Sequence, residues 1–321
     1  MAGLFDRVTS AVSPAVRLRH ALEQARAGRT AEVFPILAKA AERGDAEAQF
    51  RVGKAYLDGT GVPPSRIAAA SWLERAAGAG LTEAQSVLAA LYLTGAGKAG
   101  EGAGLFAEAS GIEPDFDKAV RWATPAAEAG SAEAQALLGY VLTSGPEHLR
   151  DVARADEWYR KSAEAGCPQG ALGYGLALMR AAQDDDDKRK GAAQIARAAA
   201  ANLPLGLYLL GVLTEGGFGL ERDGAKAAQL YRQAAERGVR SGQARWGLAL
   251  LEGRGVERDP VNGESWLRRA ALAGDAEAAA LVGDLYAKGG DLPPNFAEAA
   301  TWYTRAAEAG QAAAARALAM L

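Results

Sequence analysis

The sequence predicts an all-α fold, an α-solenoid of stacked helix-turn-helix repeats that winds as a right-handed superhelix of about eight units. A phrase of the form Ala-Ala-Glu-x-Gly returns along the chain in steps of 36 residues, with one step of 50. Small residues and aromatic residues between these phrases keep the same spacing. Alanine is also abundant, and it favours helices because it loses no side-chain entropy in them.

The recurring phrase is expected to end the second helix of each unit. Its last position falls at Gly44, Gly80, Gly130, Gly166, Asn202, Gly238, Gly274 and Gly310. Glycine adopts the left-handed conformation that ends a helix without strain, and asparagine is its usual substitute. The long step predicts an insertion of 14 residues, near residues 95–113.

The first helix of each unit is expected to follow the phrase, where residues such as Asp45 and Ser131 can cap it. A small residue marks its centre in every unit: Gly53, Ala89, Gly139, Gly175, Gly211, Gly247 and Gly283. Glycine costs about 1 kcal/mol in a helix relative to alanine. Its repeated use therefore predicts close contact between helices. The glycine pairs Gly59/Gly61 and Gly253/Gly255 are predicted to be turns between helices.

The second helix carries an aromatic residue that keeps the period. Tryptophan occupies this position at Trp72, Trp122, Trp158, Trp266 and Trp302, and Gln194 and Leu230 stand in the other two units. We expect the tryptophans to fill the gap between successive helix pairs.

These patterns divide the chain into three parts. Residues 1–44 hold an N-terminal segment and a degenerate first helix pair, residues 45–310 hold seven repeats, and residues 311–321 form a capping helix. The segment before the first pair places Leu4, Phe5, Val8 and Val12 near one helical face. It is expected to cap the first unit or to fray, and the alternatives are peripheral contact with a membrane or docking on a partner.

The repeat resembles the Sel1-like repeat, a relative of the tetratricopeptide repeat. The resemblance is carried by Asp45-Ala-Glu-Ala-Gln, by Ser131-Ala-Glu-Ala-Gln-Ala-Leu-Leu-Gly, and by Gly253-Arg-Gly-Val-Glu-Arg-Asp followed by Trp266-Leu-Arg-Arg-Ala-Ala. It implies a bacterial scaffold or adaptor in signalling, secretion or assembly, without chemistry of its own. The sequence departs from the pattern around Gln183-Asp-Asp-Asp-Asp-Lys, where the paired glycines are missing.

A line of variable positions along the first helices is the candidate partner-binding surface. The line is polar at its ends and apolar in the middle. Its apolar members are Phe50, Tyr140, Leu172, Leu176, Leu205, Tyr208, Val212 and Leu248. If the line faces solvent, it forms a hydrophobic trough that suits an extended peptide or an amphipathic helix. The alternative is that a neighbouring helix or a tighter superhelix buries the line.

Composition and charge limit the function classes. The 321 residues include 49% hydrophobic and 23% charged residues and carry a formal net charge of −3. This charge argues against a nucleic-acid partner, because phosphate binding needs a concentrated positive field. The single cysteine, Cys167, allows no intrachain disulfide, and the sequence offers neither a signal-peptide core nor an apolar run long enough to span a membrane. We expect a cytoplasmic protein.

The sequence offers no convincing motif for catalysis or metal binding. Residues 95–100 match the dinucleotide-binding fingerprint, but they follow a helix instead of a strand. His20 and His148 are too few for the usual metal sites, and the run Asp184 to Asp187 lacks the spaced ligands of a calcium loop. We therefore expect no enzyme, no cofactor and no metal.

The expected function is that of a protein-protein interaction scaffold or adaptor, which binds a protein or peptide partner on the concave face of the solenoid. The alternative is a structural accessory subunit of a larger membrane-associated assembly for secretion or polysaccharide synthesis. The sequence leaves the partner and the oligomeric state open.

Overall fold

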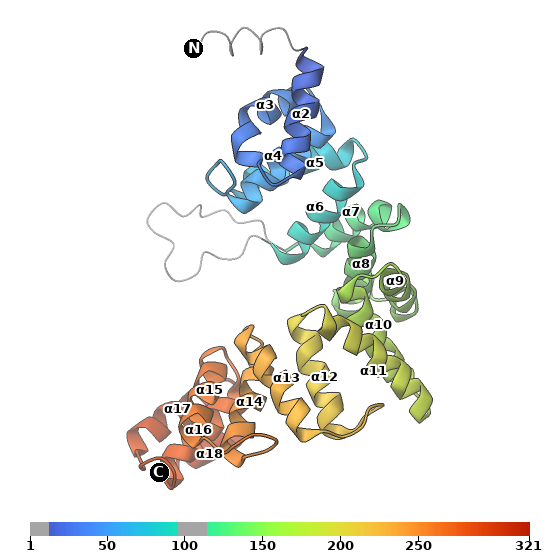
Figure 1. The fold of residues 1–321 in the computed structure, drawn as a ribbon. Coiled ribbons are helices and arrows are strands. Elements are labelled where there is room, and N and C mark those ends of the chain that lie inside the picture. Colours follow the sequence, from blue (N-terminus) through green and yellow to red (C-terminus); the bar gives the residue numbers. More distant parts are fainter. Residues whose placement is uncertain (1–12, 96–113) are drawn as a thin grey trace. The chain divides into compact units, whose positions relative to one another are not determined.

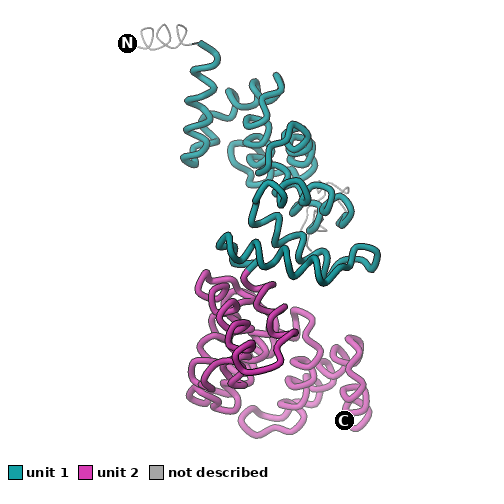
Figure 2. Tube along the Cα trace, turned by 90° about the vertical axis from the view of Figure 1, so that its right-hand side faces the viewer, with its two compact units in different colours: residues 1–170 teal, residues 171–321 magenta. Residues whose placement is uncertain are grey.

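A computed structural model describes residues 13–95 and 114–321, and over these residues the chain forms seventeen α-helices, one short 3₁₀ turn and no strand (Figure 1). The predicted all-α solenoid is confirmed. The chain divides into two compact units, residues 1–170 and residues 171–321 (Figure 2), and each is described by itself. Most of the predicted insertion, and the N-terminal segment with its possible membrane contact, lie outside the described residues.

The repeats alternate first and second helices. The first helices are α4 (Ala46–Asp58), α6 (Thr82–Thr94), α8 (Ala132–Ser144), α10 (Pro168–Ala181), α12 (Pro204–Gly216), α14 (Arg240–Glu252) and α16 (Ala276–Lys288). The second helices are α5 (Arg66–Gly78), α7 (Phe116–Glu128), α9 (Val152–Glu164), α11 (Asp185–Ala200), α13 (Gly224–Glu236), α15 (Pro260–Leu272) and α17 (Phe296–Glu308). The 3₁₀ turn η1 (Glu147–Leu149) lies between α8 and α9.

Additional helices flank the repeats. Two helices, α2 (Pro14–Arg26) and α3 (Thr30–Glu42), precede them, and the seven-residue helix α18 (Ala312–Leu318) follows them. None of the described helices is both long enough and apolar enough to cross a membrane.

Helix ends in this fold are set by polar caps and by positive backbone angles. The Asp45 carboxylate accepts a hydrogen bond from the Ala48 N–H at 2.8 Å and so begins α4, as expected for an N-cap. The glycine that closes each recurring phrase has a positive φ, for example Gly80 at 87°. Asn202 has a φ of 60° and is the one non-glycine residue with positive φ in the described part of the chain. The substitution of asparagine for glycine is thus confirmed as a left-handed helix end.

The small residues at the centres of the first helices lie against the second helices, as predicted. A Cβ atom added to Gly283 would lie 2.6 Å from the Tyr303 ring of α17, and one added to Gly53 would lie 2.9 Å from Leu73 Cγ of α5. Distances this short are incompatible with a methyl group, so the side chain of the second helix must move if glycine is replaced. Glycine is retained here because the gain in packing outweighs its cost in helix propensity.

The glycine pairs between helices do more than turn the chain. The first glycine of a pair, such as Gly253 with φ 70°, ends the first helix in the left-handed conformation. The second glycine meets the backbone of the preceding second helix. A Cβ atom on Gly255 would lie 2.1 Å from the Gly224 carbonyl oxygen, and one on Gly219 would lie 2.4 Å from the Lys188 carbonyl oxygen. These loops therefore join one repeat to the one before it.

The tryptophans of the second helices are mostly half-buried instead of fully enclosed. Trp72 packs partly against the cluster formed by α2, α3 and α4, and Trp266 packs partly against the cluster of α13 and α14. Each therefore bridges toward the preceding helices, in agreement with the predicted gap-filling role. The Arg269 guanidinium lies over the Trp266 ring, 4.5 Å from its centre, and the Lys161 ammonium lies over the Trp158 ring at the same distance. A cation over the ring lets a half-exposed indole remain at the surface.

Candidate partner-binding surface

In unit 1, the line of first-helix positions is mainly polar. Tyr140 on α8 is 47% exposed and is available to a partner. Phe50 on α4 is 7% exposed and belongs to a core cluster with Leu88 of the next first helix, α6. Phe50 therefore offers a partner little surface, because it is buried in a cluster that holds residues of α5 as well as α6. This is the outcome that the alternative interpretation of the line describes.

In unit 2, the line is apolar and partly exposed. Leu176 on α10 and Leu205 on α12 are 42% and 46% exposed, and Tyr208, Val212 and Leu248 are half-buried. Leu172, in contrast, is 8% exposed.

A regular rule explains the difference between these residues. Each first helix contributes a triplet of positions to the line, those aligned with Glu47, Phe50 and Lys54. The middle position of the triplet is buried or half-buried in every repeat, as it is for Phe50, Ala136 and Leu172. The outer positions keep more exposure, as they do for Tyr140 and Leu176. In one pair of successive first helices, α6 and α8, the middle position lies at the contact, since the Ser86 hydroxyl is 2.8 Å from that of Ser131 at the start of α8. The candidate surface is therefore carried by the outer positions.

A cleft of about 190 Å³ lies on this line in unit 2. First helices and their caps alone line it: Tyr208 comes from α12, Ala244 and Leu248 from α14, and Leu281 from α16. The structure thus brings together two residues of the predicted trough, Tyr208 and Leu248, from helices one repeat apart. This apolar floor is what the predicted binding of a partner side chain requires.

Charged groups lie around the cleft floor. Asp275 and Glu277, at the start of α16, supply two carboxylates, and Arg245 of α14 supplies a cation. The Asp275 carboxylate also accepts a hydrogen bond from the Ala278 N–H at 3.0 Å, and Arg245 lies 3.7 Å from Glu215. Glu277 is exposed and has neither a hydrogen-bond partner nor an ion-pair partner within the described part of the chain. It is the charge in the cleft that remains available to a partner.

Tyr208 packs against the second helix of its own repeat, α13. Its ring lies 6.1 Å from the ring of Tyr231 of α13, at a tilt of 41°. The Tyr231 hydroxyl donates a hydrogen bond to Glu215 at 2.7 Å. Burial and this bond raise the pKa of Tyr231 well above its usual range, so the hydroxyl keeps its proton and its bond to Glu215 into alkaline pH.

The last outer position of the line, on α16, is the charged residue Asp284. Burial works to raise the pKa of Asp284 on α16, but hydrogen bonds from Lys288 at 2.6 Å and from the Tyr303 hydroxyl at 2.7 Å lower it below its usual value. The carboxylate is therefore ionised at neutral pH and already paired. It bounds the apolar part of the line.

Other candidate sites from the sequence have structural roles in the described residues. Asp184 caps α11 by accepting a hydrogen bond from the Asp187 N–H at 2.9 Å, and the carboxylates that follow pair with Lys188, Arg189 and Lys190. Cys167 is a buried free thiol that lies 3.3 Å from Gln169. Over residues 13–95 and 114–321, no group of three or more His, Cys, Asp or Glu side chains is arranged to hold a metal ion.

Sequence reasoning missed Arg245, Leu281 and Asp275 as cleft residues. Asp275 was recognisable only as a helix cap. Arg245 and Leu281 lie outside the aligned triplets, one residue from positions that belong to them, so no spacing rule selected them. Only the packing of three successive first helices brings them to the same cleft.

The Sel1 repeat family matches residues 46–81, 102–131, 132–167, 204–239, 240–275 and 276–311, and the chain belongs to this family. The stretch 168–203 between these matches holds α10 and α11, the pair whose connecting loop lacks the paired glycines. None of the curated proteins compared with this chain matches it.

Solved structures share the fold over nearly the whole chain. A protective antigen of uropathogenic Escherichia coli with an SLR fold is 26% identical, with a TM-score of 0.68, over 98% of this chain and 66% of that one. This chain therefore spans just under two thirds of the length of the E. coli protein. A Sel1 repeat protein from Oxalobacter formigenes is 27% identical, with a TM-score of 0.62, over 99% of this chain and 92% of that one. Human IFIT1, at 15% identity and a TM-score of 0.50, is similar in fold alone.

Family membership supports a coarse statement of function. Sel1 repeat proteins generally act as scaffolds for protein interactions, and the repeat is a non-enzymatic protein-interaction fold. The candidate surface in unit 2 is compatible with this class, since it combines an apolar floor with a carboxylate that has no partner among the described residues.

Proposed function

We propose that this chain is a cytoplasmic scaffold or adaptor that binds a segment of a partner protein on the first-helix face of unit 2. One observation carries the proposal: Leu176 and Leu205 are more than two fifths exposed on the same line as the cleft formed by Tyr208 and Leu248. Exposed apolar side chains of this size next to a cleft usually mark an interaction site. Nothing in the described residues favours the alternative of a structural subunit in a membrane-associated assembly.

The cleft also indicates what the partner segment carries. Its volume of about 190 Å³ admits one large side chain, and its floor of Tyr208, Leu248 and Leu281 selects an apolar one. Glu277 at the rim selects a lysine or arginine close to that apolar residue, because the carboxylate is exposed and unpaired within the described chain. The expected partner segment therefore combines an apolar anchor with a neighbouring basic residue.

The test compares two double variants of the full chain in affinity purification from the native host. We expect Leu176→Glu/Leu205→Glu to lower the recovery of the main co-purifying partner by about tenfold or more, since charges at the centre of an apolar contact are strongly unfavourable. The matched control is Val261→Glu/Leu272→Glu. It places two charges on α15 in the same unit, at residues that are 63% and 55% exposed.

Recovery is measured by quantitative mass spectrometry, and far-UV circular dichroism verifies that each variant stays helical. Equal recovery with both double variants would reject the first-helix face as the binding surface. Glu277→Lys gives the finer test: it should weaken binding of the same partner, and unchanged binding would reject the basic residue in the partner segment.

A further inference from the structure

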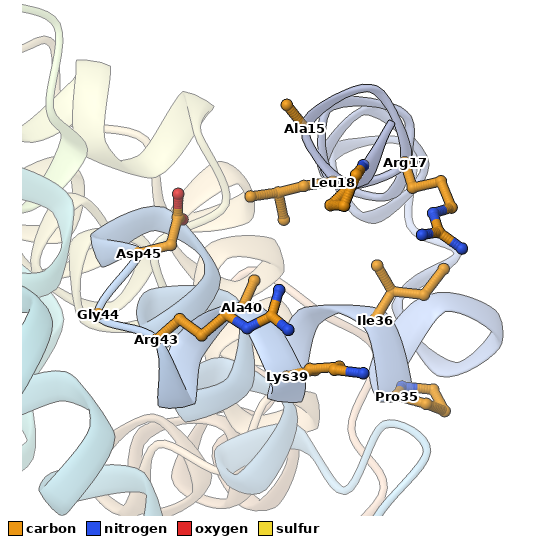
Figure 3. A pocket seen from close by; sticks show the side chains of 11 residues that line it. Ala15, Arg17, Leu18, Pro35, Ile36, Lys39, Ala40, Arg43, Gly44 and Asp45 are labelled. Atoms are coloured by element: carbon orange, nitrogen blue, oxygen red, sulfur yellow. The ribbon is translucent and has the colours of Figure 1, made fainter. Parts of the chain in front are cut away.

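A second surface lies in unit 1, near the N-terminal end of the described residues, and the proposed binding on the first-helix face of unit 2 does not involve it. A groove of about 640 Å³ runs between the first turns of α2 and the C-terminal half of α3 (Figure 3). Figure 3 shows Arg17 extending from α2 toward α3, and Ile36 extending from α3 toward α2. The groove is larger than the cleft in unit 2 and open enough to take a chain segment instead of a single side chain.

The groove exists because α2 and α3 pack along only part of their length. They are joined by a three-residue turn with Gly28 at φ 85°, the kind of turn that joins successive repeats elsewhere in the chain. In the C-terminal half of α2, Ala21 and Ala25 are buried against α3 and α4. Toward its N-terminus, Leu18 is only half-buried and Ala15 is exposed.

The groove is apolar inside. Leu18 and Ala15 line it from α2, and Pro35, Ile36 and Ala40 line it from α3. Ile36 is 42% exposed, which is high for a residue of this type inside a groove. Leaving this much apolar surface in water is unfavourable, and covering it with apolar groups would recover about 25 cal/mol for each Å².

The border of the groove is basic. Arg17, Lys39 and Arg43 line it, and none of the three has an ion-pair or hydrogen-bond partner for its side chain among the described residues. Arg26 of the same helix α2 differs, because it donates two hydrogen bonds to Glu47, the closer at 2.6 Å. The one carboxylate on the groove, Asp45, is already engaged as the cap of α4.

We infer that this groove docks an amphipathic, acidic segment of a partner protein, with its apolar side chains on Leu18, Ile36 and Ala40 and its carboxylates on Arg17, Lys39 and Arg43. The charge complementarity is specific to the groove, since the chain as a whole carries a formal net charge of −3. A concave groove with an apolar interior admits a peptide, whereas a membrane surface is too flat to reach Leu18 between the two helices. The inference does not depend on the surface in unit 2.

The experiment uses the full chain with a cysteine introduced at the groove. In the Ala15→Cys variant, which keeps Leu18, Ile36 and Ala40, the alkylation rate of the new thiol reports whether the groove is covered, because Ala15 lines the groove and is exposed and the native Cys167 is buried. Two synthetic helical peptides with the same leucine face serve as probes, one with glutamates and one with lysines on the other face. We expect the glutamate peptide to slow alkylation by about tenfold at saturation and the lysine peptide to have no effect.

Matched controls separate docking from general attraction. Val152→Cys, in the same unit and at a residue that is 47% exposed, should alkylate at the same rate with either peptide. Adding Lys39→Glu/Arg43→Glu to Ala15→Cys should abolish protection, whereas adding Arg19→Glu/Arg154→Glu, the same charge change outside the groove, should preserve it.

Several results would overturn the inference. They are no protection by the glutamate peptide, equal protection by both peptides, or loss of protection with both pairs of charge changes. Protection by anionic lipid vesicles alone would assign the groove to a membrane, and protection that rises with protein concentration without peptide would assign it to a second copy of the chain. None of these outcomes bears on the binding test with the unit 2 variants, so either proposal can be rejected while the other stands.

Discussion

Gly255→Ala will lower the free energy of unfolding of unit 2 by about 3 kcal/mol or more, whereas Gly238→Ala in the same unit will lower it by about 1 kcal/mol. Both glycines have a positive φ, 70° at Gly255 and 82° at Gly238, so alanine is strained at either position. Only at Gly255 does the new methyl group also meet backbone. It would lie 2.1 Å from the carbonyl oxygen of Gly224, whereas no atom lies within 4 Å of a Cβ on Gly238.

The excess cost at Gly255 measures the attachment of one repeat to the next. A backbone carbonyl cannot rotate away as a side chain can, so the loop that contains Gly255 must move away from the first residue of α13 and lose its contact there. Urea denaturation followed by far-UV circular dichroism gives the free energies, and hydrogen exchange locates the loss, which should centre on α13 and the loop after α14. If both variants lose equal stability, backbone strain alone explains the glycine and the loop does not join the repeats.

Periodicity in the sequence predicted much of this fold because its helix ends depend on local chemistry. Asn202 shows this well: its place in the 36-residue series predicted a positive φ, and the structure has it at 60°. The second glycine of the pair Gly253/Gly255 was predicted only as part of a turn. Spacing shows that a small residue is needed there, but it does not show that the start of α13 is the neighbour.

The candidate site was less predictable because burial on a first helix depends on how that helix packs against its neighbours. Phe50 and Tyr140 are similar in size and were placed on the same line, yet one is 7% exposed and the other 47%. Helical periodicity puts the middle and outer positions on one face and cannot rank their exposure. Tyr208 and Leu248 were predicted, and their convergence on one cleft with Leu281 depends on the packing of α12, α14 and α16.

The groove between α2 and α3 had a weaker signal in the sequence. Ile36, Lys39 and Arg43 are spaced three and four residues apart, so they share one face of α3. An apolar residue beside two cations on a helix face is common on solvated helices. Whether the described residues leave an open groove beside them depends on how α2 packs against α3, and the turn at Gly28 that joins these helices lies outside the 36-residue series.

Variants at the contact between Gly283 of α16 and Tyr303 of α17 test how closely a first helix packs against the second helix of its repeat. Gly283→Ala should destabilise unit 2 by about 2 kcal/mol, since the overpacking cost exceeds the gain of about 1 kcal/mol in helix propensity. The three nearest atoms to the added methyl group all belong to the Tyr303 ring, at 2.6, 2.7 and 3.1 Å, so the conflict is with one side chain. In a Tyr303→Ala background, itself destabilised by about 3–5 kcal/mol, Gly283→Ala should become neutral or stabilising.

Two further variants assign this coupling to the ring. Tyr303→Phe keeps the ring but removes the hydroxyl that donates to Asp284 at 2.7 Å, so Gly283→Ala should cost as much in that background as in the native chain. Gly78→Ala, at the end of α5 with no atom within 4 Å of its Cβ, should be neutral or stabilising. Urea denaturation of the four members of the Gly283–Tyr303 cycle gives the coupling energy. A value near zero would mean that the helices can separate without loss, and that the glycines at the centres of the first helices are not kept for close packing.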